Sequence, residues 1–360
     1  MYEFVKNTQI DLIVVGPEAP LANGIVDYFL VRNIKIIGPT QAAARIESSK
    51  IFARELMAKA KIPQPEFVIC ANREATNVAI AKFGLPVVIK VDGLAEGKGA
   101  FVCHQSAEVE TACQTIYEDK KFGQTKVLVE ECLSGQEMSV FALCDVSDYK
   151  IIGTAQDYKR LLDNNKGPNT GGMGAISPSP LAKPEIMEKI KKKIIEPTLK
   201  AMNQADSPFA GFLYCGLMIK DNEPRVIEFN CRLGDPETQV ILPLIKGDFF
   251  DLLWLAANHE IYQANFSLSD YSTAFVFKVA KGYPGLYVKG NLIKVPSLPN
   301  NRIIHAGTKI NEVGELVTNG GRVAGALGLS PNPSAAIKDA YVLLHQIHFE
   351  NEFYRRDIGR

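Results

Sequence analysis

The hydrophobic pattern at the start of the chain predicts a small parallel sheet. Residues 11–16 and 34–38 form short, nearly continuous apolar runs, which are typical of buried parallel strands. A helical pattern lies between them and ends near Arg32. A strand, a helix and a second strand in this order indicate part of a doubly wound sheet. We therefore predict a partial doubly wound domain over residues 1–45.

The middle of the chain alternates between predicted strands and predicted helices. Ser48 or Ser49 is a suitable N-cap for the first helix, because a hydroxyl oxygen accepts from the free amides of a helix start. The predicted helices cover 48–60, 74–83, 106–118, 184–204 and 249–257, and the predicted strands cover 86–91, 100–103, 126–131, 137–144, 150–155, 211–219 and 225–230.

The end of the chain has a different pattern. Three short strands are predicted over 274–279, 302–306 and 313–318, between glycine turns, and a last helix lies near 334–348. This composition predicts a smaller α+β domain over 259–360. The fold class is therefore multidomain, α/β and α+β, with a central domain over 46–258.

One predicted strand carries polar side chains at its end. Apolar strand formers flank Glu228 and Asn230, which therefore project from the same face. A carboxylate beside an amide oxygen suits a hard cation such as Mg²⁺, and Arg232 just beyond suits an anionic oxygen near that cation. Asp235 and Glu237 add carboxylates at a following turn. These residues predict a metal–phosphate site, and an edge strand with exposed acids is the alternative.

A glycine-rich loop over 92–99 follows one strand and precedes another. It is therefore neither a Walker A loop nor a dinucleotide fingerprint, since both of those open a helix. Glycines let backbone amides approach phosphate oxygens closely, so the loop is suited to cover a triphosphate. A surface hairpin is the alternative for the loop, and solvated surface lysines are the alternative for Lys50 and Lys90.

Two further segments suggest binding chemistry. At the end of the strand over 126–131, an inter-domain hinge would place Glu130 on an adenine amino group, and Glu137 would accept from ribose hydroxyls; an ordinary charged turn is the alternative. Lys159 and Arg160 are adjacent cations that suit a phosphate, and the glycine run over 167–175 is suited to close over a small substrate. A long surface loop is the alternative there.

Composition excludes several classes of function. Lys plus Arg and Asp plus Glu both total 40, so the net charge gives no indication of a nucleic-acid or anionic-membrane partner. No apolar run approaches the roughly 20 residues of a membrane helix. The seven cysteines are scattered without a Cys-x-x-Cys pair, which indicates free thiols in a reducing cytoplasm. The five histidines do not cluster, so a zinc site is not expected.

The order of these pieces resembles the ATP-grasp superfamily of carboxylate–amine ligases. The amino-acid sequences of six segments resemble those of the phosphoribosylamine–glycine ligase family, and the resemblance extends over essentially the whole chain. The segments are Val-Val-Gly-Pro-Glu-Ala-Pro-Leu (14–21), Asp-Gly-Leu-Ala-Glu-Gly-Lys-Gly (92–99), Gly-Pro-Asn-Thr-Gly-Gly-Met-Gly-Ala (167–175), Glu-Phe-Asn-Cys-Arg-Leu-Gly-Asp-Pro-Glu (228–237), His-Ala-Gly-Thr (305–308) and Thr-Asn-Gly-Gly-Arg-Val (318–323).

The resemblance implies an enzyme of purine biosynthesis. It implies ligation of glycine to 5-phosphoribosylamine, giving glycinamide ribonucleotide, ADP and phosphate through a glycyl phosphate intermediate. The implied cofactors are ATP and Mg²⁺ or Mn²⁺, and the implied partners are the two small substrates. It further implies a two-lobed ATP-grasp domain with its smaller lobe over about 64–133, and a cytoplasmic monomer or weak homodimer.

The resemblance also implies roles for individual residues. Arg232 would stabilise anionic transition states, with Asp235, Lys159 and Arg160 orienting substrates. The implied nucleotide-binding residues are Lys50, Lys90, Gly93, Gly97, Lys98, Gly99, Glu130, Glu131, Leu133 and Glu137. The implied metal ligands are Glu228 and Asn230, and the implied substrate-binding residues are Glu18, Asp157, Thr170, Gly171, Gly172, Met173 and Arg322.

The chain departs from the family pattern in two places. The strand before Glu228, over 215–219, lacks the acid that many ATP-grasp enzymes carry there, so a second metal is less expected. Family members begin with a further strand and a glycine-rich loop, and this sequence starts after them, which suggests an internal start or impaired activity. The alternatives to the ligase are another ATP-grasp enzyme and a truncated remnant that only binds nucleotide.

Overall fold

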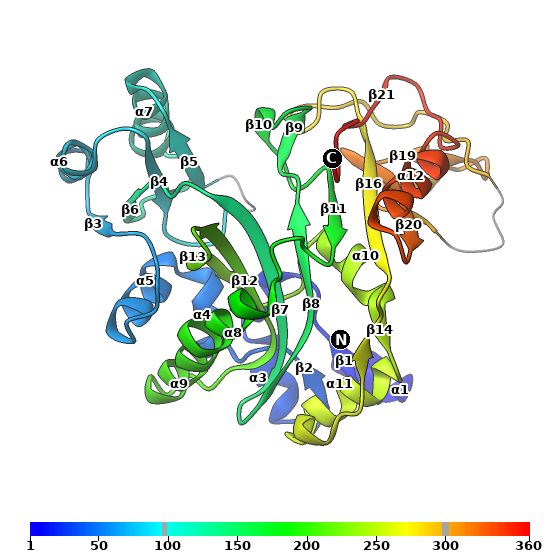
Figure 1. Cartoon of the computed structure of the whole chain (residues 1–360), viewed down its shortest axis with the longest axis horizontal. Coiled ribbons are helices and arrows are strands. Elements are labelled where there is room, and N and C mark those ends of the chain that lie inside the picture. The colour runs from blue at the N-terminus through cyan, green and yellow to red at the C-terminus, as the bar shows by residue number, and fades with distance from the viewer. Residues whose placement is uncertain (96–98, 297–301) are drawn as a thin grey trace. The chain divides into compact units, whose positions relative to one another are not determined.

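A computed structural model describes residues 1–95, 99–296 and 302–360, and the chain forms two compact units. The first unit comprises Met1–Ile151, Lys183–Leu233 and Phe249–Asn265. The second comprises Ile152–Ala182, Gly234–Asp248 and Phe266–Arg360. The chain therefore passes between the units several times, and each unit is built from segments far apart in the sequence (Figure 1).

The N-terminal part of the first unit contains the predicted parallel pair. Strand β1 (Ile13–Val14) pairs in parallel with β2 (Ile36–Ile37), which confirms the direction of both strands, although they are shorter than predicted. The single predicted helix is two helices, α2 (Glu18–Ala22) and α3 (Ile25–Leu30). The sequence pattern missed two more helices, α1 (Tyr2–Asn7) and α4 (Gln41–Ser48).

A four-stranded antiparallel sheet forms the next part of the first unit. Its strand order is β3 (Phe67–Cys70), β6 (Val127–Glu131), β4 (Val87–Val91) and β5 (Ala100–Cys103). Helices α6 (Arg73–Phe83) and α7 (Ser106–Cys113) pack against it, and a π-helical turn, Gln114–Glu118, continues α7 (Figure 1). Val87 and Ile89 on β4 and Val127 on β6 are fully buried in the core of this sheet and its helices, as the apolar runs predict.

Three longer antiparallel strands complete the first unit. They are β7 (Gln136–Asp145), β12 (Ala210–Lys220) and β13 (Glu223–Asn230), with β12 in the middle. The helical segment over 184–204 contains α8 (Pro184–Ile190), a π-helical turn (Lys191–Ile195) and α9 (Glu196–Gln204). Helix α11 (Phe249–Ala257), which has the predicted bounds, packs against β2 and β7, and a 3-10 turn (Ile261–Gln263) follows it.

A β-bulge in β13 sets the direction of the predicted metal-binding side chains. The register shifts so that Gly216 faces Glu228 while the next residue of β12, Leu217, faces Val226. The extra residue puts Val226 and Phe229 on the same buried face, and Glu228 and Asn230 on the other. The prediction that Glu228 and Asn230 share a face is confirmed.

The second unit is an antiparallel sheet with one long helix. Its strands follow the order β8 (Tyr149–Asp157), β11 (Gly174–Ser177), β16 (Ser272–Ala280), β20 (Arg322–Ser330) and β17 (Ile303–His305), and β21 (Glu352–Phe353) also pairs with β16. Helix α12 (Pro333–Leu344) packs on β16 and β20, and α10 (Glu237–Ile241) contacts β11 and β16. A 3-10 turn (Leu242–Leu244) follows α10.

Three small antiparallel pairs extend this unit. They are β9 (Arg160–Leu162) with β10 (Lys166–Asn169), β14 (Ile245–Lys246) with β15 (Ser267–Leu268), and β18 (Thr308–Ile310) with β19 (Leu316–Thr318). A long surface loop was the alternative for the segment around the glycine run, and the structure pairs residues 160–162 and 166–169 of it as strands.

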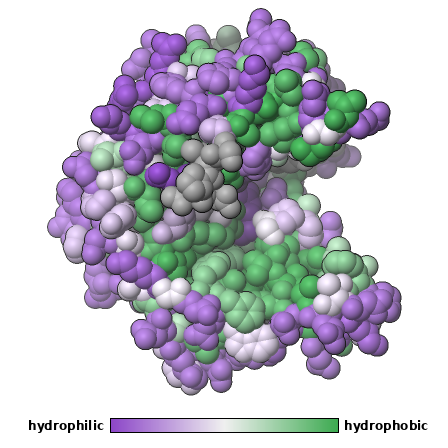
Figure 2. Space-filling view, turned by 90° about the vertical axis from the view of Figure 1, so that its right-hand side faces the viewer, coloured by the Kyte–Doolittle hydropathy of each residue, from purple (hydrophilic) through white to green (hydrophobic). Residues whose placement is uncertain are grey.

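The surface shows a mixture of apolar and polar side chains. Hydrophobic and hydrophilic residues both appear on the face drawn in Figure 2, and among the described residues Leu286 is 99% exposed. All seven cysteines are free thiols, as predicted. Among the described residues no helix has the length and apolar character that crossing a membrane requires.

Candidate active site

The first predicted lysine is held against the start of the glycine-rich loop. The Ser49 hydroxyl accepts from the Phe52 amide at the start of α5 (Lys50–Lys59). The Asp92 carboxylate accepts from the Ile51 amide at 3.1 Å, so two elements meet at this helix start. Lys50 Nζ then donates to the carbonyl of Gly93 at 2.8 Å. The structure therefore brings together Lys50 and the described part of the loop; Gly97 and Lys98 lie outside the described residues.

The second predicted lysine is buried near the metal strand. Lys90, on β4, is 6% exposed, and its Nζ donates to the carbonyl of Ile227 on β13 at 3.1 Å. It also lies 2.9 Å from the carboxylate of Glu130. Because Ile227 precedes Glu228 directly, this contact places the lysine at the strand that carries the predicted cation ligands.

Glu130 is the centre of a buried ion cluster. Its two carboxylate oxygens accept from Arg54 at 2.7 and 2.9 Å. Burial would raise the pKa of Glu130, but the charges of Lys90 and Arg54 outweigh it and lower the pKa to about 2. Both oxygens therefore contact cations, and the adenine-binding role of Glu130 stays a prediction.

Arg54 is a residue that the sequence analysis missed. Besides Glu130, it donates to the β13 carbonyls of Val226 at 3.1 Å and Ile227 at 2.7 Å. One guanidinium thus joins α5, β6 and β13, which lie far apart in the sequence. No signal in the sequence separates Arg54 from the other charged residues of α5, such as Glu55 and Lys59.

The remaining predicted nucleotide-binding residues lie near the ends of β6 and β7. Glu131 pairs with Arg225 at 2.8 Å and accepts from the Glu66 amide, so its side chain is also engaged. Leu133 is partly buried, and Glu137 is exposed at the start of β7. Gly99 directly precedes β5, where its carbonyl accepts from the Val91 amide.

Three charges face one another beside β13. Burial lowers the pKa of the Lys50 ammonium; the Glu228 carboxylate opposes this shift, and the positive charge of Lys90 adds to it. Glu228 therefore lies within electrostatic reach of the lysine that contacts the loop. The two lysines attract an anion, and the carboxylate attracts a cation. Together they suit a polyphosphate with a bound metal ion.

Asn230 has an amide whose direction is decided by its neighbours. With its nitrogen toward Glu47, the amide donates to the carbonyl of Phe229 at 2.9 Å and to Glu47 Oε1 at 3.3 Å. The amide oxygen then points away from these two acceptors. The donor set of Glu228 and Asn230 suits Mg²⁺, which takes one or two protein oxygens and completes its shell with phosphates and water. Within the described residues no group of three or more His, Cys, Asp or Glu forms a separate metal site.

Arg232 lies between two acids. Its guanidinium is 3.4 Å from Glu18 and 3.3 Å from Glu47. Glu47, from the last turn of α4, was not predicted; it also accepts from the Cys231 amide at 2.7 Å. The predicted substrate residue Glu18 and the predicted catalytic residue Arg232 therefore form one ion-paired group.

The second unit brings together a different set of predicted residues. Arg322 donates to the carbonyls of Gly171 at 2.7 Å and Asp235 at 2.8 Å, and to the Asp235 carboxylate at 2.7 Å. Asp235 also accepts from Gln239 at 2.8 Å. Arg322 thus fixes the glycine run to the turn that follows β13.

The glycine run is packed closely at Gly172. This residue has φ +108, and a Cβ there would lie 2.4 Å from Pro236 and 2.8 Å from the Asp157 carboxylate, so only glycine fits. The Gly172 amide donates to the Thr170 hydroxyl at 3.0 Å, and that hydroxyl donates to the carbonyl of Lys159 at 2.8 Å. The predicted substrate residues Asp157, Thr170, Gly171 and Gly172 are therefore neighbours, with Met173 fully buried behind them.

Comparison with known families identifies the chain. Models of the phosphoribosylglycinamide synthetase N domain, ATP-grasp (A) domain and C domain match residues 1–47, 48–238 and 273–360 respectively. The chain belongs to the phosphoribosylglycinamide synthetase family. The predicted family resemblance and the multidomain fold with a central ATP-grasp domain are confirmed.

Phosphoribosylamine–glycine ligases from several organisms align with nearly all of this synthetase. A phosphoribosylamine–glycine ligase of Escherichia coli K12 is 40% identical over 365 residues, which is 100% of this chain and 85% of the relative. One from Leptospira interrogans is 40% identical and covers 99% of this chain and 84% of the relative. The solved phosphoribosylamine–glycine ligase of Thermotoga maritima has a TM-score of 0.84 at 35% identity, over 92% of this chain and 84% of that chain.

One solved structure of lower sequence identity resembles this chain in its fold only. The biotin carboxylase domain of Hydrogenobacter thermophilus 2-oxoglutarate carboxylase, solved with MgADP, ADP and bicarbonate, has a TM-score of 0.74 at 18% identity. It covers 98% of this chain and 77% of that chain.

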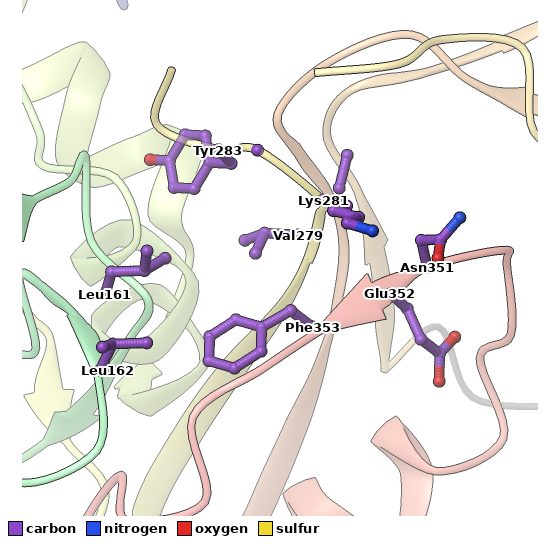
Figure 3. A pocket seen from close by; sticks show the side chains of 10 residues that line it. Leu161, Leu162, Val279, Lys281, Tyr283, Asn351, Glu352 and Phe353 are labelled. Atoms are coloured by element: carbon purple, nitrogen blue, oxygen red, sulfur yellow. The ribbon is translucent and has the colours of Figure 1, made fainter. Parts of the chain in front are cut away.

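The second unit of the synthetase also has a pocket of about 330 Å³. Leu161, Leu162, Val279, Tyr283 and Phe353 lie around it (Figure 3). The Tyr283 hydroxyl accepts from the Gly171 amide at 2.9 Å, so one wall of the pocket supports the glycine run. The pocket is mostly apolar, which suits support of the loop better than binding of a charged substrate.

Proposed function

We propose that this chain ligates glycine to 5-phosphoribosylamine with ATP, as an ATP-dependent carboxylate–amine ligase of purine biosynthesis. The product is glycinamide ribonucleotide, with ADP and phosphate. The observation that carries the proposal is the meeting of Lys50, Lys90 and Glu228 beside the loop that starts at Asp92, within a chain of the synthetase family.

The first chemical step uses the residues of the first unit. The glycine carboxylate attacks the γ-phosphorus of ATP and the bond to the ADP oxygen breaks, giving glycyl phosphate. Lys50 and Lys90 bind the phosphates, and Arg232 stabilises the negative charge that develops on the transferred group. Glu228 and Asn230 hold Mg²⁺ or Mn²⁺, which when bound neutralises charge on the phosphates. These residue roles are part of the proposal.

The second step forms the amide bond. The amine of 5-phosphoribosylamine attacks the acyl carbon of glycyl phosphate, phosphate leaves, and the nitrogen loses a proton to solvent. Asp157, Lys159, Arg160 and the glycine run bind and orient the substrates, with Asp235 and Arg322 fixing the run. A closed site would protect the acyl phosphate from hydrolysis.

Several finer expectations remain part of this proposal. They are the domain bounds 1–45, 46–258 and 259–360, the choice between Mg²⁺ and Mn²⁺, the monomer or weak homodimer, and the cytoplasmic location. The absence of nucleic-acid and membrane partners also stays a prediction.

The decisive experiment is an ADP-release assay with purified protein, ATP and Mg²⁺. We expect ADP release only when glycine and 5-phosphoribosylamine are both present, with glycinamide ribonucleotide detected in equal amount by mass spectrometry. ADP release with a different carboxylate–amine pair would indicate another ATP-grasp ligase. Nucleotide binding without turnover in every mixture would indicate a nucleotide-binding remnant, and either result overturns the proposal.

A further inference from the structure

A single carboxylate holds three consecutive residues of the candidate metal–phosphate site. Glu47 Oε2 accepts from the Cys231 amide at 2.7 Å and lies 3.1 Å from the Cys231 thiol. Its other oxygen lies 3.3 Å from the Arg232 guanidinium. With the Asn230 amide turned so that its nitrogen faces the neighbouring acceptors, that nitrogen also lies 3.3 Å from this oxygen. Each oxygen therefore serves two donors, which is the full acceptor capacity of an ionised carboxylate.

The position of Glu47 makes these contacts rigid. It lies in the last turn of α4, whose N-terminus is capped by Thr40, and α4 packs against β13. Its side chain is 8% exposed. Lys50 begins the next helix three residues later, so the same turn of the chain delivers both the carboxylate and a phosphate-binding lysine.

We propose that Glu47 is a positioning residue, which directs the Asn230 amide oxygen toward the cation and fixes the Arg232 guanidinium. This inference rests on the proposed function, because it concerns the same cation site. An amide has a donor end and an acceptor end, and an ionised carboxylate accepts only from the donor end. Glu47 therefore selects the orientation in which the oxygen of Asn230 is turned away from it. Outer residues of this kind typically change metal affinity about 10–100-fold.

The groups around Glu47 act on its pKa in opposite directions, and the net shift is upward. Burial raises the pKa of Glu47, and the Arg232 charge together with the Cys231 amide opposes that shift. Burial, with the nearby Glu47 charge, raises the pKa of the Cys231 thiol. The thiol therefore stays protonated and acts as a donor to Glu47.

The test compares Glu47→Gln with wild type by calorimetric ADP binding, with and without Mg²⁺. Glutamine keeps the size of the side chain but presents an NH₂ group to one pair of donors. With that group toward Asn230, the amide keeps only the Phe229 carbonyl of its two orienting acceptors. We expect the gain in ADP affinity caused by Mg²⁺ to fall about 10–100-fold. Metal-free ADP affinity should stay within about threefold, since Lys50 and Lys90 are untouched.

A matched control is Asp145→Asn. Asp145 is fully buried in the first unit, and it accepts from the amides of Ser147, Asp148 and Ile261, away from β13. We expect a similar loss of thermal stability in this variant with no change in the Mg²⁺ effect on ADP binding. A second variant, Glu47→Asp, keeps the charge and should recover part of the Mg²⁺ effect.

Two results would overturn the inference. One is an unchanged Mg²⁺ effect in Glu47→Gln; the other is an equal loss of ADP affinity with and without Mg²⁺, which indicates a purely structural role. Because ADP binding needs neither glycine nor 5-phosphoribosylamine, this test gives its answer even if the ligase assay fails. Failure of the inference and failure of the proposed function are thus told apart.

Discussion

The two groups of predicted site residues are held by different kinds of interaction. In the first unit, the Arg54, Lys90 and Glu130 side chains are almost fully buried, and both cations pair with the one carboxylate. In the second, Arg322 pairs with an Asp235 side chain that is 51% exposed, and most of its hydrogen bonds go to backbone carbonyls. The first group fixes charges for a polyphosphate, whereas the second fixes the shape of a loop. Substitutions should therefore affect stability and nucleotide binding in the first group, and substrate binding in the second.

The largest effect is expected from Arg54→Met. This change leaves the buried Glu130 with one cationic partner and removes the donors to Val226 and Ile227. Breaking a buried ion pair costs about 3–5 kcal/mol of unfolding free energy. Urea unfolding at pH 7 measures it, with Arg73→Met as control, because Arg73 pairs with Glu110 and Glu118 at the surface and should cost at most about 1 kcal/mol.

The same pair of variants has a pH signature. The folded pKa of Glu130 is lowered to about 2, so its ion pairs stabilise the fold above the ordinary carboxylate pKa, and this stabilisation is lost as the pH falls toward 2. The difference in unfolding free energy between wild type and Arg54→Met should therefore become smaller as the pH is lowered from 7 to 3. If Arg54→Met and Arg73→Met lose the same unfolding free energy at pH 7, the buried cluster stabilises the fold no more than the surface ion pairs do.

The next effect is expected on catalysis. Glu228→Gln removes the negative charge that faces Lys50 and one predicted cation ligand. Loss of several kcal/mol of charge stabilisation corresponds to a fall of kcat by about 100-fold or more. The control is Glu223→Gln on the same strand, which pairs with Lys189 and Lys193 and should leave kcat within about twofold. Similar kcat values for both variants would show that Glu228 does not contribute to catalysis.

An intermediate effect is expected at the glycine run. Gly172→Ala forces a Cβ against Pro236 and Asp157 in a backbone conformation with positive φ, so we expect a loss of about 2–4 kcal/mol in unfolding free energy and a higher KM for the substrates. Gly123→Ala also has positive φ but open space around it, so it isolates the backbone effect of about 1–2 kcal/mol. Thermal unfolding and steady-state kinetics compare the two, and equal losses would show that crowding at Gly172 is unimportant.

The smallest effect on stability is expected from Arg322→Met. Because the Asp235 pair is half exposed, the unfolding free energy should change by at most about 1 kcal/mol. The KM for glycine or 5-phosphoribosylamine should rise about 10-fold, which is about 1.4 kcal/mol of binding, while ADP affinity stays unchanged. Arg302→Met, which loses the ion pair with Asp339, should change neither quantity. A fall in ADP affinity for Arg322→Met would contradict the separation of roles.

Local patterns in the sequence predicted most of the elements. The N-cap at Ser49, helix α11 over Phe249–Ala257 and the face shared by Glu228 and Asn230 follow from interactions within a few residues, which composition and period reveal. The same patterns missed α4 because its buried stripe consists mainly of alanines, whose apolar signal is weak. They missed the β9–β10 hairpin because β9 has only three residues and β10 reads Lys-Gly-Pro-Asn, which contains no strand former.

Only the tertiary structure decided which side chains are partners. Arg54 and Glu130 are 76 residues apart in the sequence, and Glu47 and Cys231 are 184 apart, so no local period links them. The glutamate at 130 looked available for adenine in the sequence, whereas burial beside two cations engages both of its oxygens. The sequence by itself determined the family, the elements and the residue types of the site. The fold decided their pairing, because a charge leaves water only where another element of the chain supplies its counter-charge.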